Sequence, residues 1–388
     1  MLHHPQIIAA GFVRRLAWFY SALFVAIGIQ LPFFPLWLEA KGLDVQMIGF
    51  VLAAPMVVRL FSIPVATRLA DRHQAVRGAI VTASAAAAVG NLAVGFTEGS
   101  LAILVVFSVA SVAFTPIMPL AEAYALRGLA LVGRAYGPVR LWGSAAFIAG
   151  SLGAGWIIDS IPARNLIWLI VAALAGATVA AVGLAAPPAG TPSPASAEPS
   201  YGGFLRTPGF VAVAAAAGLI QASHAVYYGF SSLDWAMTGL DGAAIGALWA
   251  VGVIAEITLF ALSGRLPPGL GPTALLVMGA LGALVRWTAM ALDPPTALLP
   301  LLQCLHGLSF GATHLGAVGF VARAAPPGLA ATAQGNLAVV LGGAMALSMG
   351  LSGVLYGAFG GLAYAGMALM AASGGILALT AWRISPRA

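Results

Sequence analysis

Charged residues are scarce in this chain of 388 residues: they make up 7% of it, against 61% hydrophobic residues. A soluble fold covers its surface with about a quarter charged residues, so this composition excludes a water-soluble globular protein. Lysine occurs once, as Lys41, and cysteine once, as Cys304. A single cysteine excludes disulfide frameworks and cysteine metal clusters. The formal net charge of +6 comes from scattered arginines rather than a basic run, so we expect no nucleic-acid partner, no cofactor and no metal.

Long hydrophobic stretches dominate what is present. A helix needs about 20 mostly apolar residues to cross a bilayer, and these runs lack the alternation of barrel strands. The sequence therefore predicts an all-α membrane protein with twelve transmembrane helices. The predicted spans are Leu16–Leu38, Met47–Ala66, Gly78–Phe96, Ser100–Ala125, Val139–Ile158, Asn165–Ala186, Gly209–Ser232, Gly242–Leu262, Thr273–Leu292, Thr296–Val321, Ala331–Gly353 and Leu362–Trp382.

A segment rich in proline, serine and glycine divides these spans into two sets of six. Such a composition is typical of a linker. We expect an N-terminal six-helix bundle (residues 1–186), a cytoplasmic linker (residues 187–208) and a C-terminal six-helix bundle (residues 209–388). Thirteen arginines fall on the side of the two termini, whereas the opposite loops hold only two basic residues. The positive-inside rule therefore places both termini in the cytoplasm.

The two halves show traces of an internal repeat. Shifting the chain by 197 positions aligns Ile48-Gly49 with Ile245-Gly246, and Arg59 with Glu256. Many secondary transporters are built from such repeats, and they bind substrate near the bilayer midplane. The repeat indicates a transporter made of two pseudo-symmetric bundles.

Four ionisable side chains lie inside the predicted spans: Arg59, Glu122, Glu256 and Arg286. A charge at the centre of a membrane helix costs about 2.5–3.5 kcal/mol on insertion scales and normally faces a partner or a water-filled cavity. We interpret these four residues as parts of a substrate and proton pathway. The alternative is a buried ion pair that only fixes the packing of helices.

Histidines and aromatic residues supply further candidates within the spans. Histidine titrates near neutral pH and suits a proton relay, so we select His224 and His306 over His314, for which a structural role is an equal alternative. Tyr227 follows His224 by about one helical turn, and Phe147 lies deep in its span, where its ring could stack on a ring substrate. A core position is the alternative for both aromatic residues.

Several long motifs resemble one known family, the major facilitator superfamily, and within it the lactose-permease-like proton symporters of the phenylpropionate branch. The matches cover nearly the whole chain. They are PFFPLWL (Pro32–Leu38), RLADRHQAVR (Arg68–Arg77), YGPVRLWGSAAFIAGS (Tyr136–Ser151), QASHAVYYGFSSLDW (Gln221–Trp235), GVIAEITLFALS (Gly252–Ser263) and VRW (Val285–Trp287).

The resemblance implies the major facilitator fold and specific roles for residues. It places Glu122 and Arg140 at the substrate, with Arg59, Phe147, His224 and Tyr227 as further candidates that we infer from the residues themselves. It also assigns Glu256, Arg286 and His306 to the coupling of proton and substrate. The first cytoplasmic loop of the family, which governs conformational change, corresponds to Arg68, Asp71 and Arg72. The chain departs from the family at Ser309, where the permeases have an acidic proton carrier.

We therefore expect a monomeric proton-coupled symporter that moves a small organic solute, an aromatic carboxylate, across the bacterial inner membrane by alternating access. Its partners are then the solute, protons and the lipid bilayer. A nucleoside or sugar symporter and a drug exporter are alternatives within transport. A polytopic membrane sensor or enzyme is the alternative from another class, but the sequence has neither a clustered nucleophile and base nor metal-ligand spacing such as HExxH.

Overall fold

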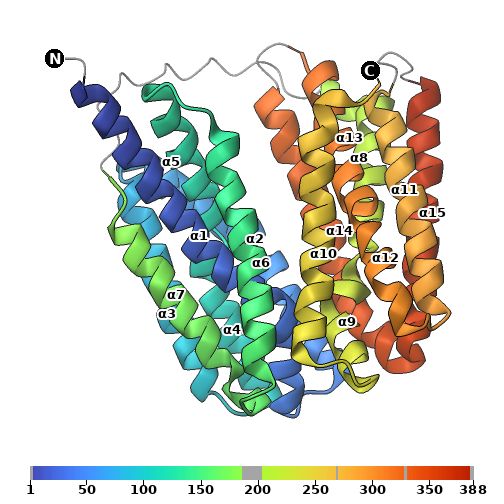
Figure 1. Cartoon of the computed structure of the whole chain (residues 1–388). Coiled ribbons are helices and arrows are strands. Elements are labelled where there is room, and N and C mark those ends of the chain that lie inside the picture. The colour runs from blue at the N-terminus through green and yellow to red at the C-terminus, as the bar shows by residue number, and fades with distance from the viewer. Residues whose placement is uncertain (1–2, 186–202, 268–269, 327–329, 385–388) are drawn as a thin grey trace. The chain divides into compact units, whose positions relative to one another are not determined.

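The computed structural model describes residues 3–185, 203–267, 270–326 and 330–384, and these residues form helices and connecting turns without a strand (Figure 1). Within this described part, eleven helical stretches are long and apolar enough to cross a membrane. The chain divides into two compact units: Met1–Pro192 with Trp235–Ala250, and Ser193–Asp234 with Val251–Ala388. The stretch Trp235–Ala250 thus belongs to the first unit, although it follows the predicted linker in sequence.

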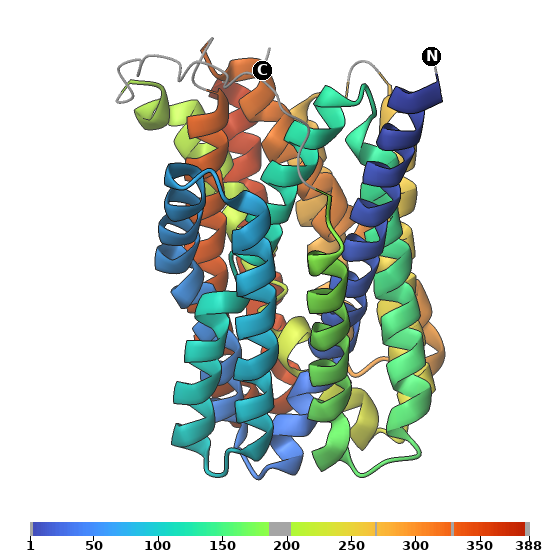
Figure 2. The same ribbon diagram turned by 90° about the vertical axis from the view of Figure 1, so that its left-hand side faces the viewer.

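The first unit is a bundle of long helices. Because α1 lies between α6 and α7, it forms the centre of this packing, and α7 also packs against α3 (Figure 2). The helices are α1 (His3–Ala40), α2 (Val45–Arg72), α3 (Val76–Phe96), α4 (Ser100–Phe114), α5 (Ile117–Leu131), α6 (Tyr136–Ile158) and α7 (Leu166–Val182), with the short turn η1 (Ala163–Asn165) before α7.

Glycines let α1 and α6 approach backbone to backbone. A Cβ atom added at Gly28 would lie 2.3 Å from the carbonyl oxygen of Phe147, and one added at Gly150 would lie 2.7 Å from that of Val25. Membrane helices associate through such small residues, because lipid supplies no hydrophobic force between them. The close contact fixes how α1 and α6 present their polar residues.

Polar side chains fasten both ends of the first unit. Near the N-terminus, Arg15 and Arg77 donate to the carbonyls of Gly183 and Val182 at 3.0 and 2.9 Å, and so hold the C-terminus of α7. Cations are favourable at this end of a helix dipole. At the opposite end, Lys41 donates to Glu98 at 2.5 Å, and this hydrogen bond lowers the pKa of the Glu98 carboxyl group.

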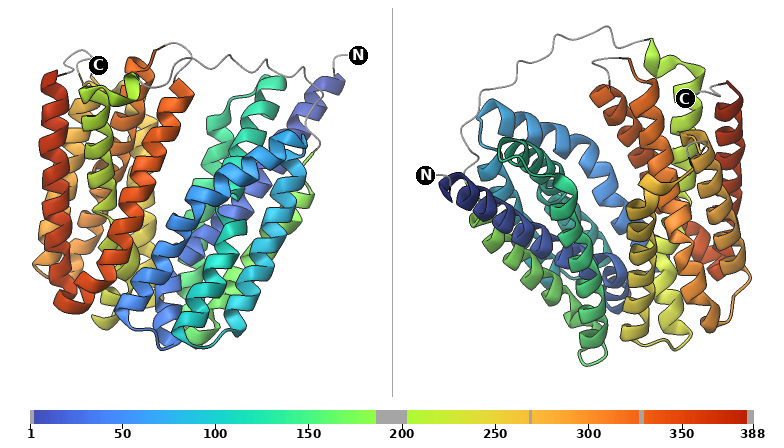
Figure 3. Two further views of the ribbon diagram at one scale, coloured as in Figure 1. Left: turned by 180° about the vertical axis from the view of Figure 1, so that it is seen from behind. Right: turned by 45° about the horizontal axis from the view of Figure 1, so that its top comes forward.

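In the second unit, α15 packs against both α8 and α11, and α8 also contacts α14 (Figure 3). Small residues dominate these helices, and their buried core includes Phe210, Leu276 and Phe320. The helices are α8 (Pro208–Ala222), α9 (Ala225–Met237), α10 (Gly242–Leu262), α11 (Pro272–Ala291), α12 (Leu299–Cys304), α13 (Thr313–Ala324), α14 (Ala330–Phe359) and α15 (Ala363–Ile384), and the turns are η2 (Phe204–Arg206), η3 (Ser263–Arg265), η4 (Thr296–Leu298), η5 (Gly307–Ala312) and η6 (Gly360–Leu362).

Several predicted spans have different boundaries in the structure. The span Ser100–Ala125 is broken between α4 and α5, where Pro116 cannot donate a backbone hydrogen bond. The span Gly209–Ser232 was too short, because α9 continues to Met237. Asp234 therefore lies in a helix, where it accepts a hydrogen bond from Tyr356, and not in an outer loop as predicted.

The last membrane-crossing stretch, Thr332–Ile384, is 53 residues long and contains both α14 and α15. Gly360, at a φ of +55°, starts the turn between these helices. The count of twelve spans and the cytoplasmic position of the termini stay predictions. Most of the predicted linker, residues 187–202, lies outside the described residues.

The first turns of α10 belong to the first unit because small residues bring them against α6. A Cβ atom at Gly246 would lie 2.5 Å from the carbonyl oxygen of Ser151, whose hydroxyl donates to the carbonyl of Gly246 at 3.1 Å. One turn earlier, the amide of Gly242 donates to Asp159 at 2.8 Å. These contacts leave no room for a side chain at Gly242 or Gly246.

The Gly28 contact predicts a specific loss of stability. Gly28→Ala should lower the free energy of unfolding by about 1–3 kcal/mol, because the new methyl group would overlap the backbone of Phe147. Gly11→Ala in the same helix is the matched control, since nothing lies within 4 Å of its new Cβ atom. Thermal denaturation in detergent should show a lower Tm for Gly28→Ala only. Equal Tm values for the two variants would contradict this packing.

Candidate functional site

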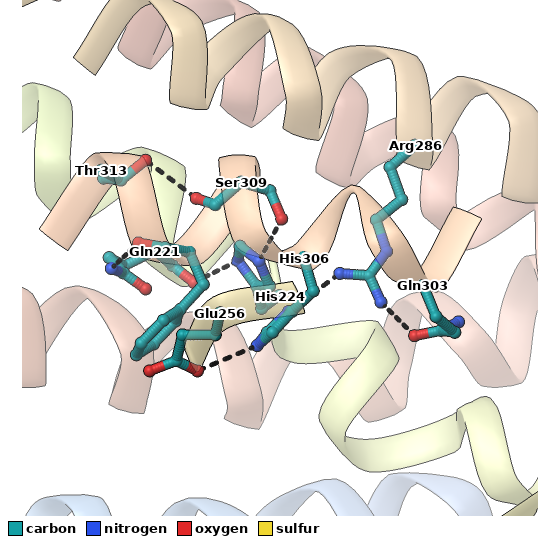
Figure 4. A network of polar contacts seen from close by, with 9 residues as sticks. Gln221, His224, Glu256, Arg286, Gln303, His306, Ser309 and Thr313 are labelled. Atoms are coloured by element: carbon teal, nitrogen blue, oxygen red, sulfur yellow. Dashed lines mark hydrogen bonds and ion pairs between the residues drawn. The ribbon is translucent and has the colours of Figure 1, made fainter. Parts of the chain in front are cut away.

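A network of mostly buried polar side chains lies in the second unit (Figure 4). Four parts of the chain contribute to it: the junction of α8 and α9, the helices α10 and α11, and the segment from α12 through η5 to the start of α13. Its members are Gln221, His224, Glu256, Arg286, Gln303, His306, Ser309 and Thr313. A bilayer offers no water to satisfy such groups, so they satisfy one another.

Arg286 on α11 is the charge at the centre of this network, and its side chain is 0% exposed. Its guanidinium donates to Gln303 Oε1 at 2.5 Å and contacts His306 Nδ1 at 3.0 Å. The rings of Tyr227 and Trp287 lie 4.3 and 4.6 Å from its central carbon, at cation–π distance. Its Nε atom has no hydrogen-bond partner among the described residues. The cation is therefore held by neutral groups.

His306 takes a defined tautomer from this contact. A guanidinium nitrogen only donates, so Nδ1 of His306 accepts from Arg286 and the ring proton lies on Nε2. Nε2 faces Glu256 Oε2 at 3.8 Å. The ring thus joins Arg286 to Glu256, and it could take a second proton only by breaking its contact with Arg286.

Glycines bring α10 close to this histidine. Gly252 faces the His306 ring, with 3.5 Å between its would-be Cβ atom and that of His306, and Gly307 faces the carbonyl oxygen of Ala255. Glu256 follows directly on α10, and its side chain keeps 23% exposure. Glu256 is therefore the most exposed member of the network.

His224 forms the second branch of the network with Ser309. Its Nδ1 lies 3.2 and 3.1 Å from the carbonyl oxygens of Ile220 and Gln221. Since carbonyls only accept, the proton lies on Nδ1, and Nε2 accepts from the Ser309 hydroxyl at 3.0 Å. The ring of His224 also lies 5.5 Å from that of His306. The two histidines therefore adopt opposite tautomers in adjacent positions.

Irregular backbone positions both branches. Between α8 and α9, the hydroxyl of Ser223 donates to the carbonyl of Ile220 and accepts from Trp287 Nε1, so that side chains replace helical hydrogen bonds at the break. The segment η5 is a π-helix, a form often found at functional sites. Its wider turn directs Ser309 toward His224, whereas Phe310 stacks on His306.

The first unit contains a separate cavity of about 410 Å³ that holds two of the predicted charges. Arg59 on α2 and Glu122 on α5 both line it, together with Pro55, Thr115 and Pro119. No hydrogen bond or ion pair joins Arg59 to another described residue. The remaining lining is mostly apolar, so the cavity combines one cation and one carboxyl group with an apolar wall.

Arg140 lies near the carboxylate rather than beside Arg59. Its guanidinium lies 4.2 Å above the ring of Phe24, and Glu122 interacts electrostatically with both Arg140 and the hydroxyl of Tyr136. That hydroxyl lies 3.3 Å from the hydroxyl of Tyr20 on α1. The substrate pair of the family is thus spatially linked in this chain.

The predicted residues fall into two groups, one in each unit. His224, Tyr227, Glu256, Arg286 and His306 meet in the second unit. Arg59, Glu122 and Arg140 share a region of the first unit, where Phe147 is buried at 6% exposure and does not line the cavity. The roles assigned to all of these residues stay predictions.

The residues predicted for the conformational loop, Arg68, Asp71 and Arg72, lie in the last turns of α2. The loop itself begins with His73, and Gln74 adopts a positive φ of 50° there. The ring of His314 lies 6.1 Å from that of Phe260 and 6.2 Å from that of Phe310. Whether His314 has a structural role stays untested.

The sequence did not indicate a role for Gln303, Ser223 or Tyr136. It also did not predict the hydrogen bond that Ser309 donates to His224. Gln303 and His306 are three residues apart, which places them on one face of a helix. This spacing was a usable signal for Gln303. The bond from Ser309 to His224 had no such signal, because it joins residues 85 positions apart.

The chain is similar in sequence to one protein family and to two named transport proteins. Residues 13–367 match the family described as MFS_1 like family. The chain is 32% identical over 316 residues to the "Probable 3-phenylpropionic acid transporter" of Escherichia coli (strain K12), covering 80% of this chain and 82% of that protein. It is 29% identical over 321 residues to the "Maltose permease" of Geobacillus stearothermophilus, covering 81% and 80%.

Solved structures show the same fold at lower sequence identity. The crystal structure of the nucleoside transporter NupG has a TM-score of 0.80 at 17% identity, covering 96% of this chain and 98% of that chain. The crystal structure of a D-xylose-proton symporter has a TM-score of 0.69 at 12% identity, covering 97% of each chain. These likenesses confirm the transporter fold, and the sequence relatives confirm the resemblance to the phenylpropionate branch.

The bond between Ser309 and His224 predicts an effect on stability. Ser309→Ala should lower the free energy of unfolding by about 1–3 kcal/mol, because it leaves a fully buried ring nitrogen without a partner. Ser231→Ala is the matched control, since Ser231 is equally buried but bonds only the carbonyl of Tyr227 in its own helix. Thermal denaturation in detergent compares the two. A Tm for Ser309→Ala no lower than that of Ser231→Ala would rule out the bond.

Proposed function

This chain belongs to the MFS_1 like family, and on that premise we propose that it is a proton-coupled symporter for a small aromatic carboxylate. It is a multi-pass membrane transporter rather than an enzyme. The two halves would alternately expose the substrate to either side of the membrane. Twelve spans, cytoplasmic termini, a location in a bacterial inner membrane and a monomeric state are parts of the same proposal.

The observation that carries the proposal is the contact series Arg286–His306–Glu256. Glu256 is the only acidic member of this network within the described chain, and its side chain retains partial exposure. Glu256 can therefore take up a proton without disturbing the tautomer of His306. His306 itself is committed to Arg286, so we assign it to positioning the carboxyl group rather than carrying the proton.

Protonation of Glu256 removes one negative charge from the interior of the second unit. A bare carboxylate is costly to carry through an apolar barrier, so the neutral form would permit the conformational change. An inside-negative potential contributes about 2.3 kcal/mol per charge per 100 mV and favours proton entry. Where the permeases have an acidic residue, this chain has Ser309, whose hydroxyl donates a neutral hydrogen bond to His224.

The cavity of the first unit supports an anionic, largely apolar substrate. Arg59 provides an unpaired guanidinium, which binds a carboxylate through two parallel hydrogen bonds. The apolar lining beside it suits an aromatic ring. An arylalkanoic acid, of the kind in the name of the Escherichia coli relative, combines these two features.

A hydroxyl-bearing substrate, a sugar or a nucleoside, is the second candidate. It is favoured by the proximity of Glu122 and Arg140, because a carboxylate accepts hydrogen bonds from sugar hydroxyls. Competition by unlabelled nucleosides and sugars against uptake of labelled 3-phenylpropionate distinguishes the two. Inhibition by the neutral compounds alone would favour this second candidate.

Glu256→Gln tests the proton carrier. In proteoliposomes with an imposed pH gradient, this variant should lose accumulation of 3-phenylpropionate, because Gln cannot release a proton. It should retain exchange of internal against external substrate, which needs no net proton movement. Glu98→Gln, in an exposed loop, is the control and should accumulate normally. If Glu256→Gln still accumulated 3-phenylpropionate, Glu256 would not be the proton carrier. If the wild type accumulated it without a pH gradient, transport would not be coupled to protons.

Arg59→Gln tests how the substrate is recognised. The variant should bind 3-phenylpropionate at least tenfold more weakly, because losing a charged hydrogen bond costs about 1.5–3 kcal/mol. Binding of the neutral 3-phenylpropanamide should change little. Arg127→Gln, at an exposed position of α5, controls for the loss of charge. Ligand-induced shifts in Tm give both affinities, and an equal loss for acid and amide would contradict an ionic role for Arg59.

A further inference from the structure

The first unit contains a second and larger cavity, which the proposed transport residues do not line. It has a volume of about 690 Å³ and lies between α1 and the start of α6. Its size falls within the range of about 300–1,000 Å³ that is typical of ligand pockets. Neither the proposed substrate residues nor the proposed coupling residues line it, so the transport mechanism leaves it unexplained.

Two arginines line this cavity, which forms a groove between α1 and α6. Arg14 on α1 and Arg134 before α6 both line it, and none of its lining residues is acidic. Neither guanidinium bonds another described residue, whereas the adjacent Arg15 holds the carbonyl of Gly183. The backbone of Arg134 is fixed by the turn at Gly133, since its amide donates to the carbonyl of Leu129. The groove therefore presents two positive charges without a counterion.

The wall of the groove is apolar and follows the membrane-spanning part of both helices. Trp18 and Trp142 line it at 69% and 60% exposure, one on each helix. Exposed tryptophans are typical of the boundary between headgroups and acyl chains. From Arg14 the lining on α1 extends to Ser21, about 10 Å deeper at ~1.5 Å per residue. The groove thus combines a basic mouth with a long apolar floor.

We propose that this groove binds an anionic phospholipid, such as phosphatidylglycerol, from the leaflet nearest the N-terminus. Arg14 and Arg134 would hold the phosphate, the tryptophans would flank the glycerol region, and the acyl chains would follow the apolar floor. Basic pockets between membrane helices bind anionic headgroups in this manner. The apolar floor distinguishes the occupant from a soluble anion, which would leave that floor exposed to water.

Tryptophan quenching by brominated lipids tests the proposal on the full-length protein in nanodiscs. Brominated phosphatidylglycerol should quench the wild type more than brominated phosphatidylcholine at the same mole fraction. The Trp18→Phe/Trp142→Phe variant should lose this excess. The Arg14→Gln/Arg134→Gln variant should show an about 30-fold lower preference for phosphatidylglycerol, since each arginine near an anionic surface contributes about a factor of five.

The Arg127→Gln/Arg323→Gln variant is the matched control, because it removes two exposed arginines that do not line the groove. It should keep the preference for phosphatidylglycerol. Equal quenching of the wild type by both lipids would overturn the proposal, as would a preference that survives Arg14→Gln/Arg134→Gln. Removal of the excess by soluble glycerol phosphate would show a site for small anions and would also overturn it.

Discussion

The polar interior of the second unit depends on one buried cation, Arg286, whose hydrogen bonds and ring contacts in the described chain involve no carboxylate. Arg286 is enclosed by Gln303, His306 and two aromatic rings. The penalty for burying an ion amounts to several kcal/mol and is only recovered when its surroundings are arranged closely around it. The interrupted helices of this unit supply that arrangement. Because Arg286 donates to Nδ1 of His306, the ring proton lies on Nε2, the nitrogen that faces Glu256.

The two units treat their arginines differently. Arg286 is buried and contacts Gln303, His306 and two aromatic rings, whereas Arg59 lines an open cavity and bonds no other described residue. A buried arginine fixes the tautomer of a histidine that it contacts, whereas an arginine that lines a cavity is available to bind a ligand. In the proposed mechanism, this difference would separate the coupling of protons from the binding of substrate, although both functions would depend on arginine.

Much of the architecture could be predicted from the sequence, because uninterrupted apolar runs have one physical solution in a bilayer. The runs located the helices, and the charges within them located both polar regions. Interruptions were harder to place. Pro116 breaks a helix because it lacks a backbone donor, whereas the break at Ser223 depends on the indole of Trp287. Asp234 was assigned to a loop, since its partner Tyr356 lies far away in the sequence.

The site was predictable only where a single helix carries it. Gln303 and His306 share a face by simple spacing, whereas the link from His224 to Ser309 depends on how two distant helices meet. No pattern of residues in one segment reports such a meeting. The cavity around Arg59 likewise results from the packing of four helices, so no single segment of the sequence predicts it.

The π-helical turn at Gly307–Ala312 has a consequence for evolutionary comparison. Each turn of this kind accommodates about one residue more than an α-helical turn. A relative without the turn would need one residue fewer to present the same side chains after His306. In a comparison with such a relative, correspondence by counting would therefore shift by one position beyond Ala312. Homologous positions in this helix are better matched by the direction of their side chains than by their order along the chain.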